Sequence, residues 1–214
     1  MRRVLVMAAA LAAGAVLGGG LVWLVLPSSP PSPPPPTPPR AGPAGPDCRP
    51  SWSPAGYGAP VPSSPCAGPH WQHDGLAGGF SHDRAGAEFA AVHLSTRLAS
   101  ASGPNVYAPT LARQTVGDYQ QALGQTQQET SNTPAAQSLP RQWWARTSGD
   151  PASGVVTVDL AAATDESRSL GGYAGMSLTL RWQDGDWKLV LPKQDPRLIA
   201  STAGYELLGP SGGA

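Results

Sequence analysis

The clearest structural pattern in this chain of 214 residues is the stretch Ser177-Leu-Thr-Leu-Arg-Trp-Gln-Asp-Gly-Asp-Trp-Lys-Leu-Val-Leu191. The dipeptide Asp184-Gly185 at its centre favours a two-residue type I′ turn, because both residues tolerate a positive φ angle. The cross-strand pairs that this turn predicts are Gln183 with Asp186, Trp182 with Trp187, Leu180 with Leu189 and Leu178 with Leu191. One face of the hairpin is then wholly apolar, whereas the face that carries Arg181 and Lys188 meets water or a partner.

Two more strands are expected upstream of this hairpin. Residues 142–147 carry two tryptophans and residues 154–161 carry several branched apolar residues, and both segments are bounded by Gly, Pro or Asp. Pro192 and Pro196 end the last strand, because proline cannot donate to a strand ladder. The sequence therefore predicts a meander of four antiparallel strands.

Before the strands, the apolar period changes to that of helices. Apolar residues recur at spacings of 4, 3, 4 and 3 in the row Ala87, Ala91, Leu94, Leu98 and Ala101, and Ser81 can cap this helix. A shorter helix is expected over residues 108–114, and a third begins at Asp118, where Gln121 completes a capping box. Three helices followed by four strands predict an α+β fold, with the helices packed on one face of a curved antiparallel four-stranded sheet.

The first 26 residues predict a membrane anchor. Residues 1–3 contain two arginines and residues 4–26 contain no charge, so a helix of about 34 Å can cross the hydrocarbon core. The positive-inside rule keeps the arginines in the cytoplasm and places the rest of the chain outside. A cleaved signal peptide is the alternative, but the apolar run is longer than a signal-peptide core and lacks a small-residue cleavage site.

The predicted transmembrane helix also contains a stripe of small residues, Ala10, Gly14 and Gly18, at intervals of four. This spacing lets two helix backbones approach closely and would support a homo-oligomer. The alternative is that the stripe only reflects the abundance of Ala and Gly throughout the chain.

Residues 27–69 hold 17 of the 25 prolines and predict a disordered, polyproline-like linker that keeps a domain away from the bilayer. Cys48 and Cys66 lie in this linker, where they form a disulfide in an oxidising exterior or remain two free thiols. Two thiols are too few for a metal site. Residues 70–192 are then the extracytoplasmic α+β domain, and residues 193–214 are a C-terminal extension.

The formal charge of the whole chain is zero, but the two parts differ in sign. Residues 1–69 carry about +3, and residues 70–214 carry about −3 from 10 basic and 13 acidic residues. An acidic outer domain disfavours contact with nucleic acid, so no direct nucleic-acid partner is expected.

The order of elements and the motif Trp182-Gln-Asp-Gly185-Asp-Trp187-Lys-Leu189 resemble the nuclear transport factor 2-like cone fold. The layout of a short cytoplasmic end, one span, a linker and such a domain resembles single-pass scaffold components of type IV secretion and Gram-positive conjugation machines. The segment from Gly79 to His93 is similar to uncharacterised membrane proteins of actinobacterial mobile elements. These resemblances imply a non-enzymatic interaction domain outside the cell membrane, with other envelope proteins as its partners.

A cone-shaped domain leaves two other functions open, namely binding of a small ligand between helix and sheet and a hydrolase or isomerase reaction there. The cavity candidates are His93, Asp159 and Tyr173, because cone-fold enzymes use a buried acid or histidine as a general base. The alternation around Asp159 turns it toward solvent, where Arg181 can pair with it. Nucleophile motifs and phosphate-binding loops are absent from the sequence, so no enzymatic activity and no cofactor are expected.

Histidines give no clear metal site. His70 and His73 lie three residues apart between Pro69 and Gly75, which predicts a solvated loop without a third ligand. His82 and His93 would lie about 16 Å apart along a helix and cannot share one ion.

Of the seven tryptophans, Trp71 and Trp143 are expected on an exposed contact surface. Trp144 lies on the opposite face of the same strand from Trp143 and is expected in the core, together with Trp182 and Trp187.

Overall fold

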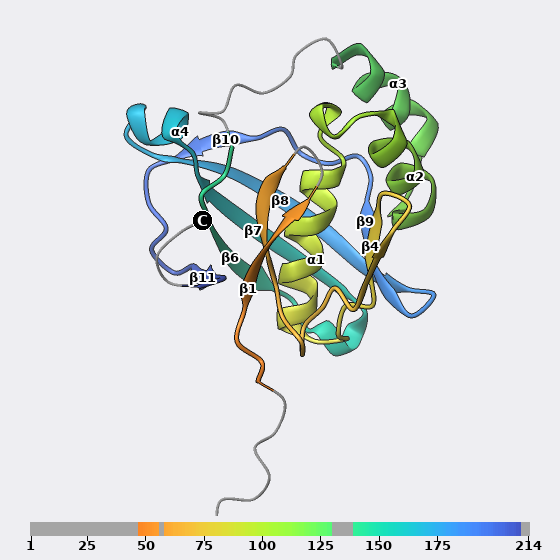
Figure 1. Cartoon of the computed structure of the whole chain (residues 1–214), viewed down its shortest axis with the longest axis horizontal. Helices are drawn as coiled ribbons and strands as arrows, with labels where there is room; N and C mark the ends of the chain where they lie inside the picture. Colours follow the sequence, from red (N-terminus) through yellow and green to blue (C-terminus); the bar gives the residue numbers. More distant parts are fainter. Residues whose placement is uncertain (1–46, 56–57, 130–138, 211–214) are drawn as a thin grey trace, which may run out of the picture. The chain divides into compact units, whose positions relative to one another are not determined.

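The computed structural model describes residues 47–55, 58–129 and 139–210 (Figure 1). The predicted cytoplasmic end, the predicted span at residues 4–26 and its stripe Ala10, Gly14 and Gly18 lie outside these residues. Within the described part, no helix is long and apolar enough to cross a membrane.

The main sheet follows the order β11-β6-β7-β8-β9-β5, and β10 pairs with β8. Its strands are β5 Thr115–Val116, β6 Gln142–Ser148, β7 Val155–Ala163, β8 Tyr173–Gln183, β9 Asp186–Val190, β10 Arg197–Ile199 and β11 Glu206–Leu208. The pairs from β6 to β9 are antiparallel as predicted, but β5 runs parallel to β9, so the sheet is mixed. The predicted four-stranded sheet was incomplete, because strands of two or three residues leave no alternating pattern in the sequence.

The β8–β9 hairpin has the predicted turn and register. Asp184 and Gly185 have φ angles of 55° and 79°, and Trp182 lies opposite Trp187. The register ends at Leu180 and Leu189, so the predicted pair of Leu178 with Leu191 does not form. The backbone N–H of Leu191 instead donates to the carbonyl oxygen of Val116 at 2.8 Å, which continues the contact with β5.

Four helices accompany the sheet in the described residues: α1 Arg84–Arg97, α2 Pro104–Gln114, α3 Tyr119–Glu129 and α4 Asp165–Ser169. The cap of α1 is Asp83, whose carboxylate accepts the backbone N–H of Gly86 at 2.8 Å, whereas the predicted cap Ser81 donates to that carboxylate. Asp118 accepts the N–H of Gln121 at 3.0 Å before α3, as predicted. These elements confirm the α+β class.

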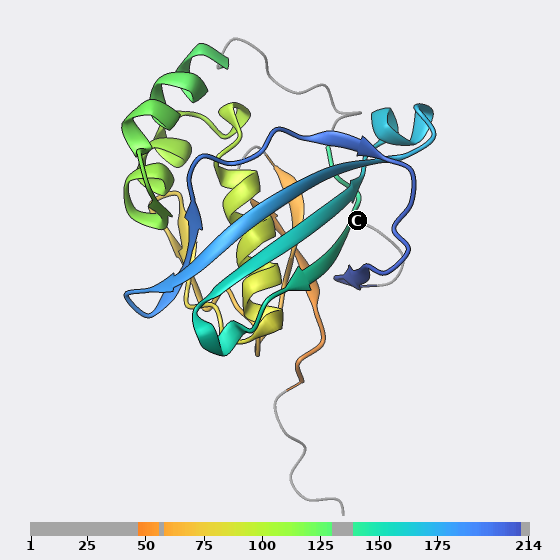
Figure 2. The same ribbon diagram turned by 180° about the vertical axis from the view of Figure 1, so that it is seen from behind.

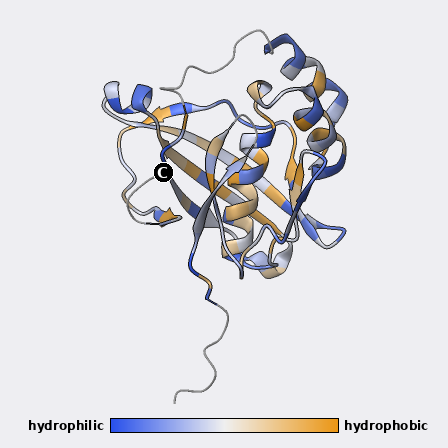
Figure 3. Ribbon diagram, in the orientation of Figure 1, coloured by the Kyte–Doolittle hydropathy of each residue, from blue (hydrophilic) through white to orange (hydrophobic). Residues whose placement is uncertain are grey.

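Helix α1 is buried on almost every side, because it packs against both the main sheet and a separate hairpin. Viewed from behind, the main sheet lies across one side of α1 (Figure 2). A hairpin of β1 Ser51–Ala55 and β2 Ala59–Ser63 packs on another side. Four residues of the predicted stripe, Ala87, Ala91, Leu94 and Leu98, are buried in the core, whereas the fifth, Ala101, lies beyond α1 in a short 3-10 turn and is only partly buried. Hydrophobic and hydrophilic segments both occur along α1 and the strands behind it (Figure 3). The outer helices α3 and α4 are mainly hydrophilic.

The β1–β2 hairpin corrects the predicted boundary of the linker. Residues 27–69 were predicted to be disordered, but residues 47–55 and 58–69 belong to the folded domain. Val61 is fully buried, and Trp52 packs against the same core. Prolines are tolerated here because β1 and β2 form a small sheet of two edge strands, with Pro62 opposite Trp52 and Pro60 opposite Pro54.

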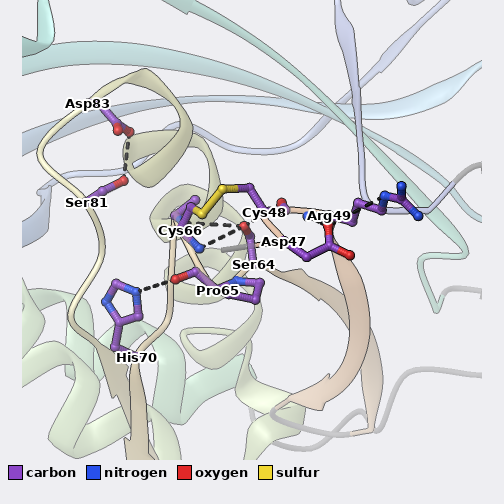
Figure 4. Close-up of a disulfide and its surroundings, with 10 residues drawn as sticks. Asp47, Cys48, Arg49, Ser64, Pro65, Cys66, His70, Ser81 and Asp83 are labelled. Carbon is purple, nitrogen blue, oxygen red and sulfur yellow. Dashed lines mark hydrogen bonds and ion pairs between the residues drawn. A yellow bond between two sulfur atoms is a disulfide. The ribbon is translucent and has the colours of Figure 1, made fainter. Parts of the chain in front are cut away.

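Cys48 and Cys66 form a disulfide that closes the ends of this hairpin (Figure 4). The hydroxyl of Ser64 connects the two ends further. It donates to the carbonyl oxygen of Cys48 at 2.9 Å and accepts the N–H of Cys66 at 3.2 Å. The structure thus contains the disulfide, and the alternative of two free thiols is wrong.

A second small hairpin consists of β3 Trp71–His73 and β4 Leu76–Gly78. The segment between Pro69 and Gly75 was predicted to be a loop, but most of it is a strand. Its turn residues Asp74 and Gly75 have φ angles of 51° and 77°, the same combination as in the β8–β9 turn.

The C-terminal residues also belong to the main sheet. Arg197 of β10 lies opposite Gly175, and Leu207 of β11 lies opposite Trp144. Gly175 is needed at this point, because a Cβ atom there would lie 2.8 Å from the side chain of Ile199. The predicted limits of the domain, residues 70–192, are therefore too narrow at both ends.

Candidate functional site

The space between α1 and the sheet is filled by core side chains. Trp187 and Leu94 are fully buried, and Leu98 is almost so. A hollow remains at one end, between α2, α3 and the segment from Leu191 to Lys193, with a volume of about 100 Å³. Small-molecule sites usually measure about 300–1,000 Å³, so this hollow is too small for the predicted cone ligand.

His93, the first cavity candidate, faces β2 instead of a cavity. Its Nε2 atom lies 3.0 Å from the carbonyl oxygen of Pro62, and its Nδ1 atom lies 2.9 Å from Arg97 Nη1. A carbonyl oxygen only accepts, so Nε2 carries the proton and Nδ1 accepts from Arg97. Burial, together with the charge of Arg97, lowers the pKa of His93 to about 3. His93 is therefore a neutral residue of the core.

Asp159, the second candidate, points away from α1 as predicted. Its carboxylate pairs with Arg146 Nη2 at 2.8 Å rather than with the predicted partner Arg181. Partial burial acts to raise the pKa of Asp159, but hydrogen bonds from Arg146 and Ser177 outweigh it, and the net direction is downward. An ion-paired carboxylate with a lowered pKa is poorly suited to act as a general base.

Tyr173, the third candidate, lies at the start of β8. Its ring packs edge-on against Trp144 with 5.3 Å between centroids, and the guanidinium of Arg168 lies 4.9 Å above it. The structure therefore does not bring His93, Asp159 and Tyr173 together at one site.

The predicted roles of the two adjacent tryptophans are reversed. Trp143 is only 4% exposed, and its indole N–H donates to the carbonyl oxygen of Pro60 at 3.0 Å. Trp144 is on the opposite, half-buried face of β6. The reason is that Trp143, Ala145 and Thr147 form the buried face of this strand.

The side chain of Trp71 is exposed, as predicted, and it borders a groove that could receive a partner. Its side chain is 38% exposed and stacks on His73 with 4.7 Å between ring centroids. The groove has a volume of about 430 Å³ and lies between the β3–β4 hairpin, the end of α2 and the β8–β9 turn. We call it the Trp71 groove, lined by Trp71, His73, Arg113, Gln114, Asp186 and Lys188.

Asp186 joins the two hairpins at the floor of the Trp71 groove. Its carboxylate accepts backbone N–H groups from Gly79 at 2.7 Å, Phe80 at 3.2 Å and Trp187 at 2.9 Å. Burial raises the pKa of Asp186, and these hydrogen bonds act in the opposite direction. Gly78 is required beside it, because a Cβ atom there would collide with the Trp71 ring and lie 2.5 Å from Asp186 Oδ2.

The charges at the groove are unevenly paired. Lys188 forms an ion pair with Asp184, whereas Arg113 is exposed and has no ion pair among the described residues. The amide nitrogen of Gln114 donates to the carbonyl oxygen of Ala77 at 2.7 Å, but its Oε1 atom has no donor among the described residues. The groove therefore offers an aromatic wall, one unpaired cation and a buried acceptor, which are features of a binding surface.

The remaining histidines do not assemble a metal site. His70 Nε2 lies 3.1 Å from the carbonyl oxygen of Pro65 (Figure 4), and His73 contacts the neighbouring Asp74. His82 stacks on Trp182 with 4.1 Å between centroids. The described residues contain no group of three or more side chains that could hold a metal ion.

Two buried charged residues of α1 were missed in the sequence. Glu88 accepts a hydrogen bond from Thr147 at 2.6 Å, and burial raises the pKa of this carboxyl group. Arg97 is 4% exposed and contacts His93 and Gln72. Charged residues on a helix usually face water, but Glu88 lies against β6 of the main sheet and Arg97 lies against β3. Neither tertiary contact has a pattern in the local sequence.

A family model described as a domain of unknown function (DUF8175) matches residues 25–206, so the chain belongs to this family. No curated protein matches the chain. No solved structure matches it either.

Proposed function

We propose that this protein is a non-enzymatic, membrane-anchored interaction domain that contacts another envelope protein through the Trp71 groove. The observation that carries this proposal is the combination of an exposed Trp71 with the unpaired Arg113 at one groove of about 430 Å³. Tryptophan and arginine are the residues that most often dominate the binding energy of protein interfaces.

The groove also indicates the chemistry of the partner. Its aromatic wall fits an apolar side chain, and Arg113 is available to an acidic one. Asp184 and Lys188 already satisfy one another, and Asp186 is occupied by backbone N–H groups. We therefore propose a partner segment with an apolar residue next to a carboxylate.

The proposed location outside the membrane rests on two features. The uncharged residues 4–26 can form a span, and the Cys48–Cys66 disulfide is typical of an oxidising compartment. Helix α1 packed on a curved sheet supports the nuclear transport factor 2-like assignment, although the β1–β2 cover and the parallel strand β5 depart from the predicted pattern. A role as a scaffold component of a secretion or conjugation apparatus is the narrower form of this proposal, supported by the resemblance in layout.

Site-specific photocrosslinking in intact cells tests the proposed contact. A photoreactive amino acid is placed at position 71 of the whole chain and, as a control, at position 119, because Trp71 and Tyr119 are both 38% exposed. We expect a discrete, light-dependent adduct from position 71 and none of that size from position 119.

A charge reversal then tests the partner chemistry. Arg113→Glu should reduce the yield of this adduct at least several-fold, because a carboxylate on the partner would be repelled. Arg181→Glu reverses an exposed charge on the outer face of the hairpin and should leave the yield unchanged. Equal adducts from positions 71 and 119, or an equal loss in both charge variants, would count against the Trp71 groove.

A further inference from the structure

Arg97 is a buried cation that has no anionic partner in the described part of the chain. Only 4% of this residue is exposed, and no carboxylate of the described residues lies within 4 Å of its guanidinium. Burial alone lowers the pKa of Arg97 to about 10, and no acidic group of the described residues acts against that shift. Buried charges are normally paired, so this arrangement is unusual.

The hydrogen bonds of Arg97 leave part of the guanidinium available. Nη1 donates to His93 Nδ1 at 2.9 Å and approaches the His93 carbonyl oxygen at 3.5 Å, and Nη2 donates to Gln72 Oε1 at 2.8 Å. A guanidinium has five N–H donors. The Nε–H and one Nη2–H therefore have no acceptor among the described residues.

Arg97 lines a second hollow of about 310 Å³ at the β3–β4 hairpin, which shares His73 and Leu76 with the Trp71 groove. We call it the Arg97 hollow. Its remaining walls combine the polar Gln72 and His73 with the apolar Pro54, Leu76 and Val106. The volume is close to the lower limit of small-molecule sites.

The wall next to α2 is held in place by the β3–β4 turn. A Cβ atom on Gly75 would lie 2.7 Å from the carbonyl oxygen of Asn105 and 3.0 Å from Val106 Cα, so only glycine lets the turn approach the helix this closely. Gly75 also has a φ angle of 77°, which favours glycine. The hollow is therefore built between packed elements.

We propose that the Arg97 hollow binds a small organic monocarboxylate, with its carboxylate on Arg97 and its apolar part against Pro54, Leu76 and Val106. One guanidinium supplies one positive charge and a planar pair of donors, which matches a carboxylate. His93 is neutral, so no second positive charge is present within the Arg97 and His93 pair for a phosphate dianion.

Thermal unfolding of the whole chain in detergent, followed by tryptophan fluorescence, tests this proposal. The probes are butyrate, the neutral isostere butyramide and inorganic phosphate, each compared with chloride at equal ionic strength. Butyrate should raise Tm in a saturable way, by roughly 3–6 °C at ten times its Kd. Butyramide and phosphate should give no saturable rise.

The variant Gln72→Glu separates the hollow from other binding surfaces. It places a carboxylate where Gln72 Oε1 now accepts from Arg97 at 2.8 Å, so it supplies an internal counter-ion. Its Tm without ligand should be higher than that of the wild type, and its response to butyrate should be lost. Gln120→Glu adds the same charge on the exposed surface of α3 and should retain the full response.

Four outcomes would overturn the proposal. A wild-type protein that does not respond to butyrate has no such site, and an equal response to butyramide shows that the carboxylate is not recognised. An equal response to phosphate would show that the hollow binds anions in general and is not selective for a monocarboxylate. A response that persists in Gln72→Glu places the bound butyrate elsewhere.

Discussion

Replacing His93 by glutamine should make the free energy of unfolding less sensitive to acid. In the folded protein, this imidazole is fully buried and donates to the carbonyl oxygen of Pro62 while it accepts from Arg97. A proton on Nδ1 would remove that acceptor and place two positive charges side by side in the core. Glutamine can keep both contacts with its amide, but it cannot take up a proton.

The size of the effect follows from the shift in pKa. The pKa of His93 is about 3 in the folded state, against 6.5 for an unperturbed histidine. Because the folded value is the lower one, the stabilising contribution is complete above pH 6.5 and is lost as the pH falls from 6.5 toward 3. Between pH 7 and pH 5, the loss amounts to about 2 kcal/mol, and over the whole window it approaches about 5 kcal/mol.

Urea unfolding of the wild type and His93→Gln at pH 7 and pH 5 measures this loss. The substitution itself alters packing at both pH values, so the informative quantity is the change in the difference between the two proteins. From pH 7 to pH 5, the free energy of unfolding of the wild type should fall by about 2 kcal/mol more than that of His93→Gln.

His70→Gln is the matched control, because His70 also contacts a backbone carbonyl, that of Pro65, but is exposed. Because this variant retains His93, it should keep the larger loss of stability between pH 7 and pH 5 that the wild type shows. If the difference between the wild type and His93→Gln stays constant from pH 7 to pH 5, the inferred tautomer and the neutral state of His93 are wrong.

Three further predictions concern the same core and its cover. Glu88→Gln should raise the free energy of unfolding at pH 7. Burial raises the pKa of Glu88 in the folded state, so the wild type loses stability as the pH rises through this raised pKa. In urea titrations below pH 4.5, the variant should therefore no longer be more stable than the wild type. Trp143→Phe removes the hydrogen bond to the β2 backbone and should lower the free energy of unfolding by about 1–3 kcal/mol in the same assay, whereas an unchanged value would show that this bond is not formed. Replacing both Cys48 and Cys66 by serine should lower the free energy of unfolding by about 3 kcal/mol, and a reducing agent should then have no additional effect on stability.

The parts of the fold with strong local patterns were predictable. The Asp184-Gly185 turn, the stripe from Ala87 to Leu98 and the N-terminal cap of α3 follow from short-range rules, and the structure confirms them. The strands β5, β10 and β11 were not predictable, because their two or three residues are held by pairing with long strands rather than by their own pattern. Asp74-Gly75 is the same turn dipeptide as Asp184-Gly185, but the neighbouring Pro and His residues favoured the prediction of a loop over that of a hairpin.

Of the residues that line the candidate site, only Trp71 was predictable from the sequence. Trp71 was expected on a contact surface, and it borders the groove. Arg113 and Gln114 come from the end of α2 and reach the same groove only through the tertiary packing of α2 beside β4 and β9. Trp143 was wrongly predicted to be exposed, because two adjacent tryptophans on one strand fit either register. In the structure, the face of β6 that carries Trp143 packs on α1, and the indole N–H of Trp143 donates to Pro60 of β2.

The β1–β2 cover also explains why a proline-rich sequence can complete a core. Proline lacks a backbone N–H but keeps its carbonyl oxygen as an acceptor. Pro60 accepts from the indole of Trp143, and Pro62 accepts from His93, so both carbonyls satisfy buried donors of the main domain. The proline-rich sequence therefore belongs to the folded domain from Asp47 onward, and it contributes Trp52 and Val61 to the packing of the core.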